Sequence, residues 1–565
     1  MSSTQRPLTL SQVAQLRRAA SPAGGEPARP LADLLRTCAA SPIDDAAVLV
    51  ELHDTLLYMC AYPRSRAIER ACEQALVTCA ASAKRLACSA RGRRRLQGSG
   101  LPWSRTAVAF GLPIARWLAH RWPELSRIDS VGEGGRELPQ LVRHIWSPLE
   151  GESLSATDGT LALLEDCGCP EESRLSWLTR QLDDLQVPDA LRDDLYDSLQ
   201  VFVAVDLADS GLSRSRLRGP KVPLHPHDGR AARLAELPAR LRHPLPPAIS
   251  LDKATRQQLI DAARGTLVVL GRETDPISLC DERNLEYLEL GRGVCIALYS
   301  AVPGRRFALD SHVGFLLFKN SVPVAYGGGW PFLGLCKIGV NIFPAFRGGE
   351  SAYLFTEVLR VYAQRFAVQT FEVEPYQFGA GNAEGLRSGA YWFYYRLGFR
   401  SIEPRIAQLA EQEFARVCAD RTYRSPLPVL RRLARCNIRL PVEPAASALE
   451  PCDAATLSVA VSQWIAREFA GDRQQAQRHA LARVRRALGV PARPAWPAPE
   501  WRAFCDFAAL LAMVDDLADW SAREKADCVA MLRAKGAVPE RHYFERMAAH
   551  TRFRASMEAL AHRSS

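Results

Sequence analysis

The chain has 565 residues, of which 47% are hydrophobic and 24% are charged, and its formal net charge is +10. A single hydrophobic core stops growing at roughly 250–300 residues, so we expect about two to four domains. The basic residues are mostly arginines scattered along stretches that also carry acidic residues, and the densest run, Arg91–Arg95, has no aromatic residue within it. This pattern is typical of solvated helix faces and argues against a nucleic-acid partner.

The 15 cysteines are dispersed through apolar stretches, and the closest pair, Cys167 and Cys169, has no second pair with histidines at ligand spacing. We interpret them as small buried residues in a reducing compartment, and we predict no metal site. Residues 1–30 are rich in Ser, Pro, Ala and Gly and are predicted to be disordered. Because no apolar run reaches the roughly 18–20 residues that span a bilayer, we expect a cytoplasmic protein without a membrane partner.

Residues 31–211 are predicted to form a helical domain. Apolar residues recur at helical spacing in Ile43–Met59 and in Ala67–Cys88,. A proline opens a further predicted helix, Asp189–Val205, since proline is favoured at the first helical position,. Residues 101–150 show weaker periodicity and receive no assignment.

The segments on either side of the chain's middle differ in composition. Residues 212–250 contain a cluster of prolines and are predicted to be a linker,. Residues 441–565 are predicted to form a second helical domain, in which Ser521–Glu524 fits a capping box,. An apolar stripe at helical spacing, Phe504–Val514, is typical of a packed helix. Apolar stripes on these flanking regions would also permit a homodimer.

Between them, residues 251–440 are predicted to form a mixed α/β domain, so the fold class is α+β with helical regions on both sides. Asn320 and Ser321 suit a two-residue hairpin turn,. The predicted elements, in chain order, are strands at Val294–Tyr299, Val313–Lys319, Val322–Tyr326 and Lys337–Phe343, a helix at Glu350–Phe366, a strand at Thr370–Glu374 and a helix at Gly385–Leu397,.

The junction between the fourth of these strands and the following helix suggests a phosphate site. The strand ends before Pro344, the chain passes through Arg347, Gly348 and Gly349, and a helix begins at about Glu350. Glycines let a backbone approach a ligand closely, and a helix N-terminus offers free N–H groups and a positive dipole end. An adjacent arginine adds charge-assisted donors. The alternative is that the glycines only make a tight turn.

This junction resembles the pyrophosphate loop, Arg-x-x-Gly-x-Gly/Ala, of the GNAT acyltransferase superfamily. The later stretch Tyr394-Tyr395-Arg396-Leu397-Gly398-Phe399 resembles that family's Tyr-x-x-x-Gly-Phe motif. The resemblance covers about a fifth of the chain and implies acetyl-CoA or another acyl-CoA as co-substrate. Two positions depart from the family: Glu350 replaces the central glycine, and Arg387 stands where an asparagine is common. The implied acyl-CoA contacts are Ile342, Phe343, Arg347, Gly348, Gly349, Ser351 and Ala352.

Acyl transfer to an amine needs a general base for the nucleophile and an acid for the leaving thiolate. The resemblance implies Tyr394 as the acid, although it could equally be a core aromatic, since four consecutive aromatics cannot all face one ligand. We predict Glu374 as the base, because it shares a strand face with Glu372 and lies nearer the strand end. An ion-paired strand face is the alternative for both carboxylates, and His312 is the alternative base.

Four further residues are candidates for the acceptor pocket. Tyr326 and Trp330 flank three consecutive glycines, which indicate a bulge or a close backbone approach,. Gln377 and Asn382 lie in a glycine-containing loop after the fifth strand and could orient an acceptor,. A bend in the sheet and a solvated loop are the structural alternatives.

The sequence therefore predicts an acyl-CoA-dependent N-acyltransferase, with acetyl as the first choice of acyl group and an unidentified amine acceptor. Two alternatives stay open. The central region could have the same fold without using coenzyme A, for which Glu350 is the motive. The chain could also be a scaffold or binding protein, because more than half of it is helical sequence without catalytic motifs.

Overall fold

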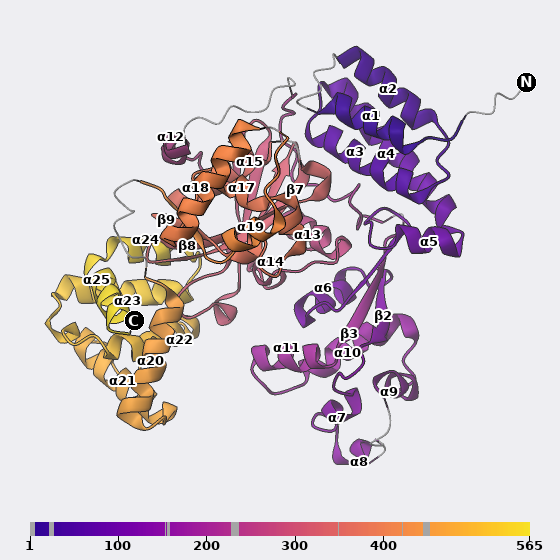
Figure 1. Ribbon diagram of the computed structural model, residues 1–565. Coiled ribbons are helices and arrows are strands. Elements are labelled where there is room, and N and C mark those ends of the chain that lie inside the picture. Colours follow the sequence, from indigo (N-terminus) through magenta and orange to yellow (C-terminus); the bar gives the residue numbers. More distant parts are fainter. Residues whose placement is uncertain are drawn as a thin grey trace, which may run out of the picture.

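The structure is a computed structural model that describes residues 6–21, 28–152, 154, 159–208, 210–227, 237–347, 350–420, 422–443 and 452–564. Figure 1 shows four parts in chain order: a helical bundle, a lobe with a small sheet, a central part with a large sheet, and a second helical bundle at the C-terminus. The fold is mixed α/β, with an eight-stranded and a three-stranded sheet among the described residues.

The N-terminal bundle is built around one helix that is apolar on nearly all sides, as a central helix should be. That helix, α3, starts after Asp45, whose carboxylate accepts from the N–H groups of Ala47 and Val48,. The prediction of disorder over residues 1–30 is wrong for α1, because Thr9 and Gln12 form a capping box there,. The helices are α1 (Leu10–Ala20), α2 (Ala28–Ala40), α3 (Ala46–Ala61), α4 (Arg66–Ala87) and α5 (Ala90–Leu96).

A small antiparallel sheet, in the order β1-β3-β2, follows the bundle. Its strands are β1 (Arg105–Val108), β2 (Ser126–Val131) and β3 (Val201–Asp206). The purely helical prediction for residues 31–211 is therefore wrong. The helix predicted over Asp189–Val205 ends at Ser198, and Gln200, with φ 50°, turns the chain into the central strand β3. That strand is largely buried, and its continuous apolar run lacks the alternation that would reveal it,.

Helices cover this sheet and give the lobe its own core, in which Leu118, Leu178 and Val203 are fully buried. These helices are α6 (Leu112–Arg121), α7 (Leu138–Val142), α8 (Pro148–Gly151), α9 (Thr160–Asp166), α10 (Arg174–Asp183) and α11 (Asp189–Ser198).

The central sheet has the order β10-β11-β9-β8-β7-β6-β5-β4. Only the β8–β9 pair is parallel among the described pairs. The five predicted strands are confirmed, and the hairpin turn has positive φ at both Asn320 (47°) and Ser321 (64°), as a type I′ turn requires,. The strands are β4 (Glu286–Gly291), β5 (Val294–Ser300), β6 (Val313–Lys319), β7 (Val322–Phe332), β8 (Leu335–Ile342), β9 (Thr370–Val373), β10 (Arg400–Ser401) and β11 (Ile438–Pro441).

Helices lie on both faces of this sheet. On one face, the Tyr362 hydroxyl of α15 (Ser351–Arg365) donates to the Val313 carbonyl at 2.6 Å. On the other, α13 (Lys253–Val269) and α14 (Asp275–Ser278) pack, and the Tyr299 hydroxyl donates to Leu259 of α13 at 2.9 Å.

The helix predicted over Gly385–Leu397 is instead two helices, because Gly389 adopts φ 64°, which ends the first of them,. These two, and the helices that follow them, are α16 (Ala383–Ser388), α17 (Ala390–Arg396), α18 (Pro404–Ala419) and α19 (Leu427–Leu433).

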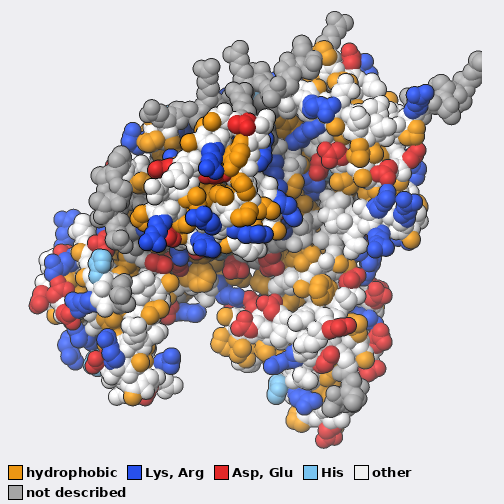
Figure 2. All heavy atoms as spheres, viewed as in Figure 1, with side chains coloured by type: hydrophobic (Ala, Val, Ile, Leu, Met, Phe, Trp, Pro, Cys, Tyr) orange, Lys and Arg blue, Asp and Glu red, His pale blue; other side chains and the backbone are white. Residues whose placement is uncertain are grey.

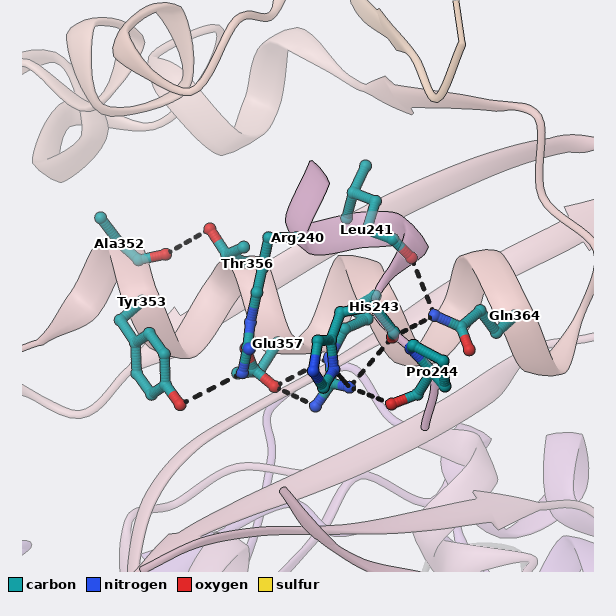
Figure 3. Close-up of polar contacts among 10 residues, drawn as sticks. Arg240, Leu241, His243, Pro244, Ala352, Tyr353, Thr356, Glu357 and Gln364 are labelled. Carbon is teal, nitrogen blue, oxygen red and sulfur yellow. Dashed lines mark hydrogen bonds and ion pairs between the residues drawn. The ribbon is translucent and has the colours of Figure 1, made fainter. Parts of the chain in front are cut away.

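Part of the predicted linker 212–250 is bound firmly to α15, as Figure 3 shows. Arg240 in α12 (Leu237–Arg242) donates to Glu357 at 2.6 Å, and Arg360 donates to the same carboxylate group at 2.6 Å. Glu357 and Arg360, both on α15, are almost fully buried beneath this part of the predicted linker. Arg360 also donates to the carbonyls of His243 and Pro244, so this stretch is packed structure and the linker prediction is wrong for it.

The C-terminal bundle begins beyond β11, and the predicted capping box at Ser521 is present at the start of α23. Its helices are α20 (Ala454–Phe469), α21 (Arg473–Leu488), α22 (Ala498–Ala512), α23 (Ala522–Gly536), α24 (Arg541–Ala549) and α25 (Thr551–Ser564). Throughout the described ranges, helices fall short of the length and apolarity that crossing a bilayer requires.

Candidate functional site

The two parallel strands of the central sheet separate along their length. Register pairing between β8 and β9 covers only Leu335–Lys337 against Thr370–Glu372. Beyond that point β9 ends at Val373, and Pro375 follows, which has no N–H to donate,. Strand β8 continues to Ile342, so one edge of its last residues has no strand partner among the described residues. An unpaired edge of this kind can hydrogen-bond the backbone-like amides of a ligand.

A cavity of about 680 Å³ lies beside this open edge, which we call the wedge cavity. It is lined by the end of β8, the start of α15 and residues of α16 and α17. Among the residues predicted from sequence, it brings together Ile342, Arg347, Ser351, Ala352, Gln377, Asn382 and Tyr394. Gly348 and Gly349 lie outside the described residues.

Four predicted site residues, Phe343, Tyr326, Trp330 and Glu374, do not line this cavity. Phe343 is buried and stacks on Tyr326 with ring centroids 5.6 Å apart. Trp330 stacks on His312 at 4.0 Å, and Glu374 lies on the surface. Asn382 does line the cavity, but it also caps α16 by accepting from the Gly385 N–H at 3.0 Å.

Glu350 turns away from the wedge cavity. Its side chain is fully buried, 3.0 Å from the Lys319 ammonium and 2.8 Å from the Arg292 guanidinium. Although burial raises the pKa of this carboxyl, the charges of Lys319 and Arg292 hold the pKa below its ordinary value. The carboxylate is therefore neutralised inside the fold, and the first turn of α15 keeps its N–H groups for the cavity side.

The basic group at the cavity mouth is Arg347. Its guanidinium donates to the Ile342 carbonyl at 3.2 Å and forms an ion pair with Glu384. The side chain is 45% exposed, so the ion pair is weak and can be exchanged for a stronger anion,. Arg347 and Ser351, the first residue of α15, both line the wedge cavity, so a phosphate bound at the start of this helix could contact the guanidinium,.

The aromatic run on α17 divides between two environments. Trp392 and Tyr395 pack against Phe414 of α18, whereas Phe393 and Tyr394 line the wedge cavity. The Tyr394 ring touches Phe355, and burial raises the pKa of its hydroxyl well above the ordinary value. The hydroxyl therefore remains protonated at neutral pH and can donate a proton within the cavity.

The two strand carboxylates are ion-paired, which is the structural alternative that the sequence left open. Glu372 is buried and accepts from Arg439 at 2.6 Å and from Asn437 at 2.7 Å. Glu374 has a side chain that is 55% exposed, and its oxygen lies 3.5 Å from the Lys337 ammonium. The structure therefore gives no support to Glu374 as the base.

The other candidate base, His312, lies directly on the opposite face of the sheet from α15. Its Nε2 atom would be 2.6 Å from a Cβ placed on Gly328, so only glycine leaves room for the ring there. Burial lowers the pKa of His312 to about 4, and the imidazole is therefore neutral at physiological pH. Among the described residues we find no hydrogen bond to its ring nitrogens, so a lone pair is available.

Comparison with protein-family models, curated proteins and solved structures finds no match to this chain. Within the part of the chain that the structure describes, no three His, Cys, Asp or Glu side chains converge in a way that would hold a metal ion. Because these comparisons find no match, the functional interpretation rests on the wedge cavity and on the residues around His312.

Proposed function

We propose that the chain is an acyl-CoA-dependent N-acyltransferase that passes an acyl group, acetyl in the first instance, directly to an amine. One observation carries the proposal: the separated edge of β8 leads to the N-terminus of α15, with Arg347 beside it. The open edge suits the amides of a pantetheine arm, and the helix start with its arginine suits a pyrophosphate. The sequence resemblance described above supports the same function.

The position of Glu350 removes an objection to this proposal. A free carboxylate at the loop would repel a pyrophosphate, but this one is bound to Lys319 and Arg292 in the interior. The wedge cavity is also of the size expected for a small-molecule site, at about 680 Å³,.

A bound acyl-CoA would supply an activated carbonyl and a thiolate leaving group. The chain would contribute a proton donor at the Tyr394 hydroxyl and polar groups at Gln377 and Asn341 in the wedge cavity. Burial raises the pKa of this hydroxyl, which keeps it protonated but also makes it a weaker acid, so it would hydrogen-bond the departing sulfur and pass on its proton only as negative charge develops there,.

Isothermal titration calorimetry with acetyl-CoA tests the proposal. The intact chain should bind acetyl-CoA, and Arg347→Ala should weaken binding by about 10–100-fold, the value of one charge-assisted contact. Arg405→Ala is the matched control, because Arg405 is exposed on α18 and no hydrogen bond or ion pair is found for it among the described residues. Absence of binding to the intact chain, or equal affinity in the Arg347 variant, would refute the proposal.

A further inference from the structure

We propose that the acyl acceptor is a basic amino acid that enters through a second cavity, the interlobe cavity, and that His312 takes the proton from its amine. This inference rests on the proposed acyltransferase function and assigns its acceptor side. The interlobe cavity has a volume of about 340 Å³ and is lined by residues from three parts of the chain. Figure 2 shows the open notch between the two lower lobes, with acidic side chains at its inner end.

Three of the four parts of the chain contribute to this cavity. Asp193, Asp194 and Asp197 come from α11 of the small-sheet lobe, Asp275 comes from α14, and Glu540 precedes α24 of the C-terminal bundle. His312 lies at its inner side, at the end of the loop before β6. The small-sheet lobe and the C-terminal bundle therefore help to build the acceptor side, which gives both a role in the reaction.

The carboxylates of the cavity are only partly neutralised. Asp193 forms an ion pair with Arg305, and Glu540 lies 3.2 Å from the Lys535 ammonium. For Asp194, Asp197 and Asp275, no side-chain hydrogen bond or ion pair is found in the described parts of the chain. The surplus of negative charge favours a ligand with positively charged groups.

A buried arginine adds a second requirement on the ligand. The Arg306 side chain is 3% exposed and lines the cavity. Its Nε donates to the Ala301 carbonyl at 3.1 Å and lies 3.4 Å from the Glu540 carboxylate, and its Nη1 donates to the carbonyls of Lys535 and Ala537, both at 2.7 Å. For its Nη2, no hydrogen-bond partner is found among the described residues. A buried unpaired donor is costly, and a carboxylate or carbonyl oxygen of a ligand would satisfy it. Amino groups for the carboxylates and an oxygen for Arg306 together describe a basic amino acid.

A row of glycines joins the interlobe cavity to the wedge cavity. Gly314, Gly328 and Gly339 are directly opposed on β6, β7 and β8, and so they share one face of the sheet,. His312 lies over Gly328, and Gln377 lies over Gly339, within 2.9 Å of where a Cβ would stand.

Directly opposed residues are about 4.5–5.5 Å apart, so His312 and Gln377 lie side by side above the sheet. His312 lines the interlobe cavity and Gln377 lines the wedge cavity. An amine held at His312 is thereby within one strand spacing of the separated strands where the acyl donor would lie.

The transfer balances with these groups. The attacking amine first releases one proton to solvent, since only the free base has a lone pair, and its nitrogen then forms a bond to the acyl carbon as the carbon–sulfur bond breaks. The nitrogen loses a second proton to Nε2 of the neutral His312, and the thiolate receives the proton of Tyr394. Both side chains return to their starting state by proton exchange with solvent through the cavities.

Calorimetric titration of the full chain with three matched probes tests the acceptor class. L-Ornithine carries all the required groups, L-norvaline lacks the second amine, and 1,4-diaminobutane lacks the carboxylate. We expect ornithine to bind, and each of the other two to bind at least about 10-fold more weakly, since each loses a charged contact. Equal affinity of norvaline would overturn the cationic assignment, and equal affinity of 1,4-diaminobutane would overturn the amino-acid assignment.

Two variants locate the site. Asp194→Asn with Asp197→Asn and Asp275→Asn should abolish ornithine binding and leave acetyl-CoA binding unchanged, because none of the three lines the wedge cavity. His312→Gln should lower acyl transfer at saturating ornithine by about 100-fold or more, the contribution of a general base. Ornithine binding that survives the triple substitution, or transfer that survives His312→Gln, would refute the site.

The acetyl-CoA titration separates the two proposals. Acetyl-CoA binding without ornithine binding overturns the acceptor assignment and leaves the acyltransferase function standing. A chain that binds no acetyl-CoA refutes the function itself, whatever the result with ornithine.

Discussion

The buried ion pair between Lys319 and Glu350 provides a direct test of how the loop is built. Both side chains are fully buried, their charged atoms are 3.0 Å apart, and Lys319 also donates to the Arg292 carbonyl at 2.7 Å. Lys319→Met would leave Arg292 as the nearest cation to the Glu350 carboxylate. Removing one partner of a buried pair costs about 3–5 kcal/mol, because the other charge stays desolvated.

This loss converts into a large thermal shift. For a unit of about 150–250 residues, each kcal/mol changes the melting temperature by about 2–4 °C, so Lys319→Met should lower it by roughly 6–20 °C. The measurement is thermal unfolding followed by circular dichroism at pH 7. Combining Lys319→Met with Glu350→Gln should recover part of the loss, because the buried charge is then removed. A shift of less than about 2 °C, or strictly additive losses in the double variant, would refute the reasoning.

The same pair predicts a pH dependence. The pKa of Glu350 is held below its ordinary value of 4.5, so its stabilisation is fully present above that pH and is lost as the pH falls through the lower folded value,. Glu350→Gln should therefore lack this part of the acid destabilisation. Glu350→Gly should destabilise the chain by leaving Lys319 unpaired, and we do not expect it to strengthen acetyl-CoA binding.

Three further predictions concern the proposed reaction. Tyr394→Phe should lower the turnover number by about 100-fold and keep the calorimetric affinity for acetyl-CoA, whereas a parallel loss of affinity would indicate a packing role. Gly328→Ala would place a Cβ 2.6 Å from His312 Nε2, so acyl transfer should fall with acetyl-CoA affinity unchanged, and unaltered transfer kinetics would contradict that. Arg17→Ala removes a 2.6 Å hydrogen bond from α1 to the Ala345 carbonyl, so calorimetry should show weaker acetyl-CoA binding, and an unchanged affinity would show that the bundle does not position the loop.

Local patterns were sufficient for much of the central fold. Side chains that alternate or run apolar over a few residues predicted five strands of the large sheet, and Asn320 and Ser321 predicted the turn between two of them. The chemistry of these signals acts between residues close in sequence, as it does in the capping box at Ser521. The same patterns missed β3, because a buried strand and a buried helix segment are both continuous apolar runs,.

The arrangement of the site depended on contacts between distant residues. Sequence placed Glu372 and Glu374 on one strand, but Arg439 and Lys337 decide that both are ion-paired. It identified His312 only as an alternative.

By itself, the sequence determined the strand-to-helix junction at Arg347 and the aromatic helix that carries Tyr394. Only the tertiary structure decided that Glu350 is neutralised inside the fold and that Gly314, Gly328 and Gly339 line up across three strands. The physical reason is that side-chain periodicity encodes which face a residue occupies, whereas register and packing determine which distant residue lies opposite it.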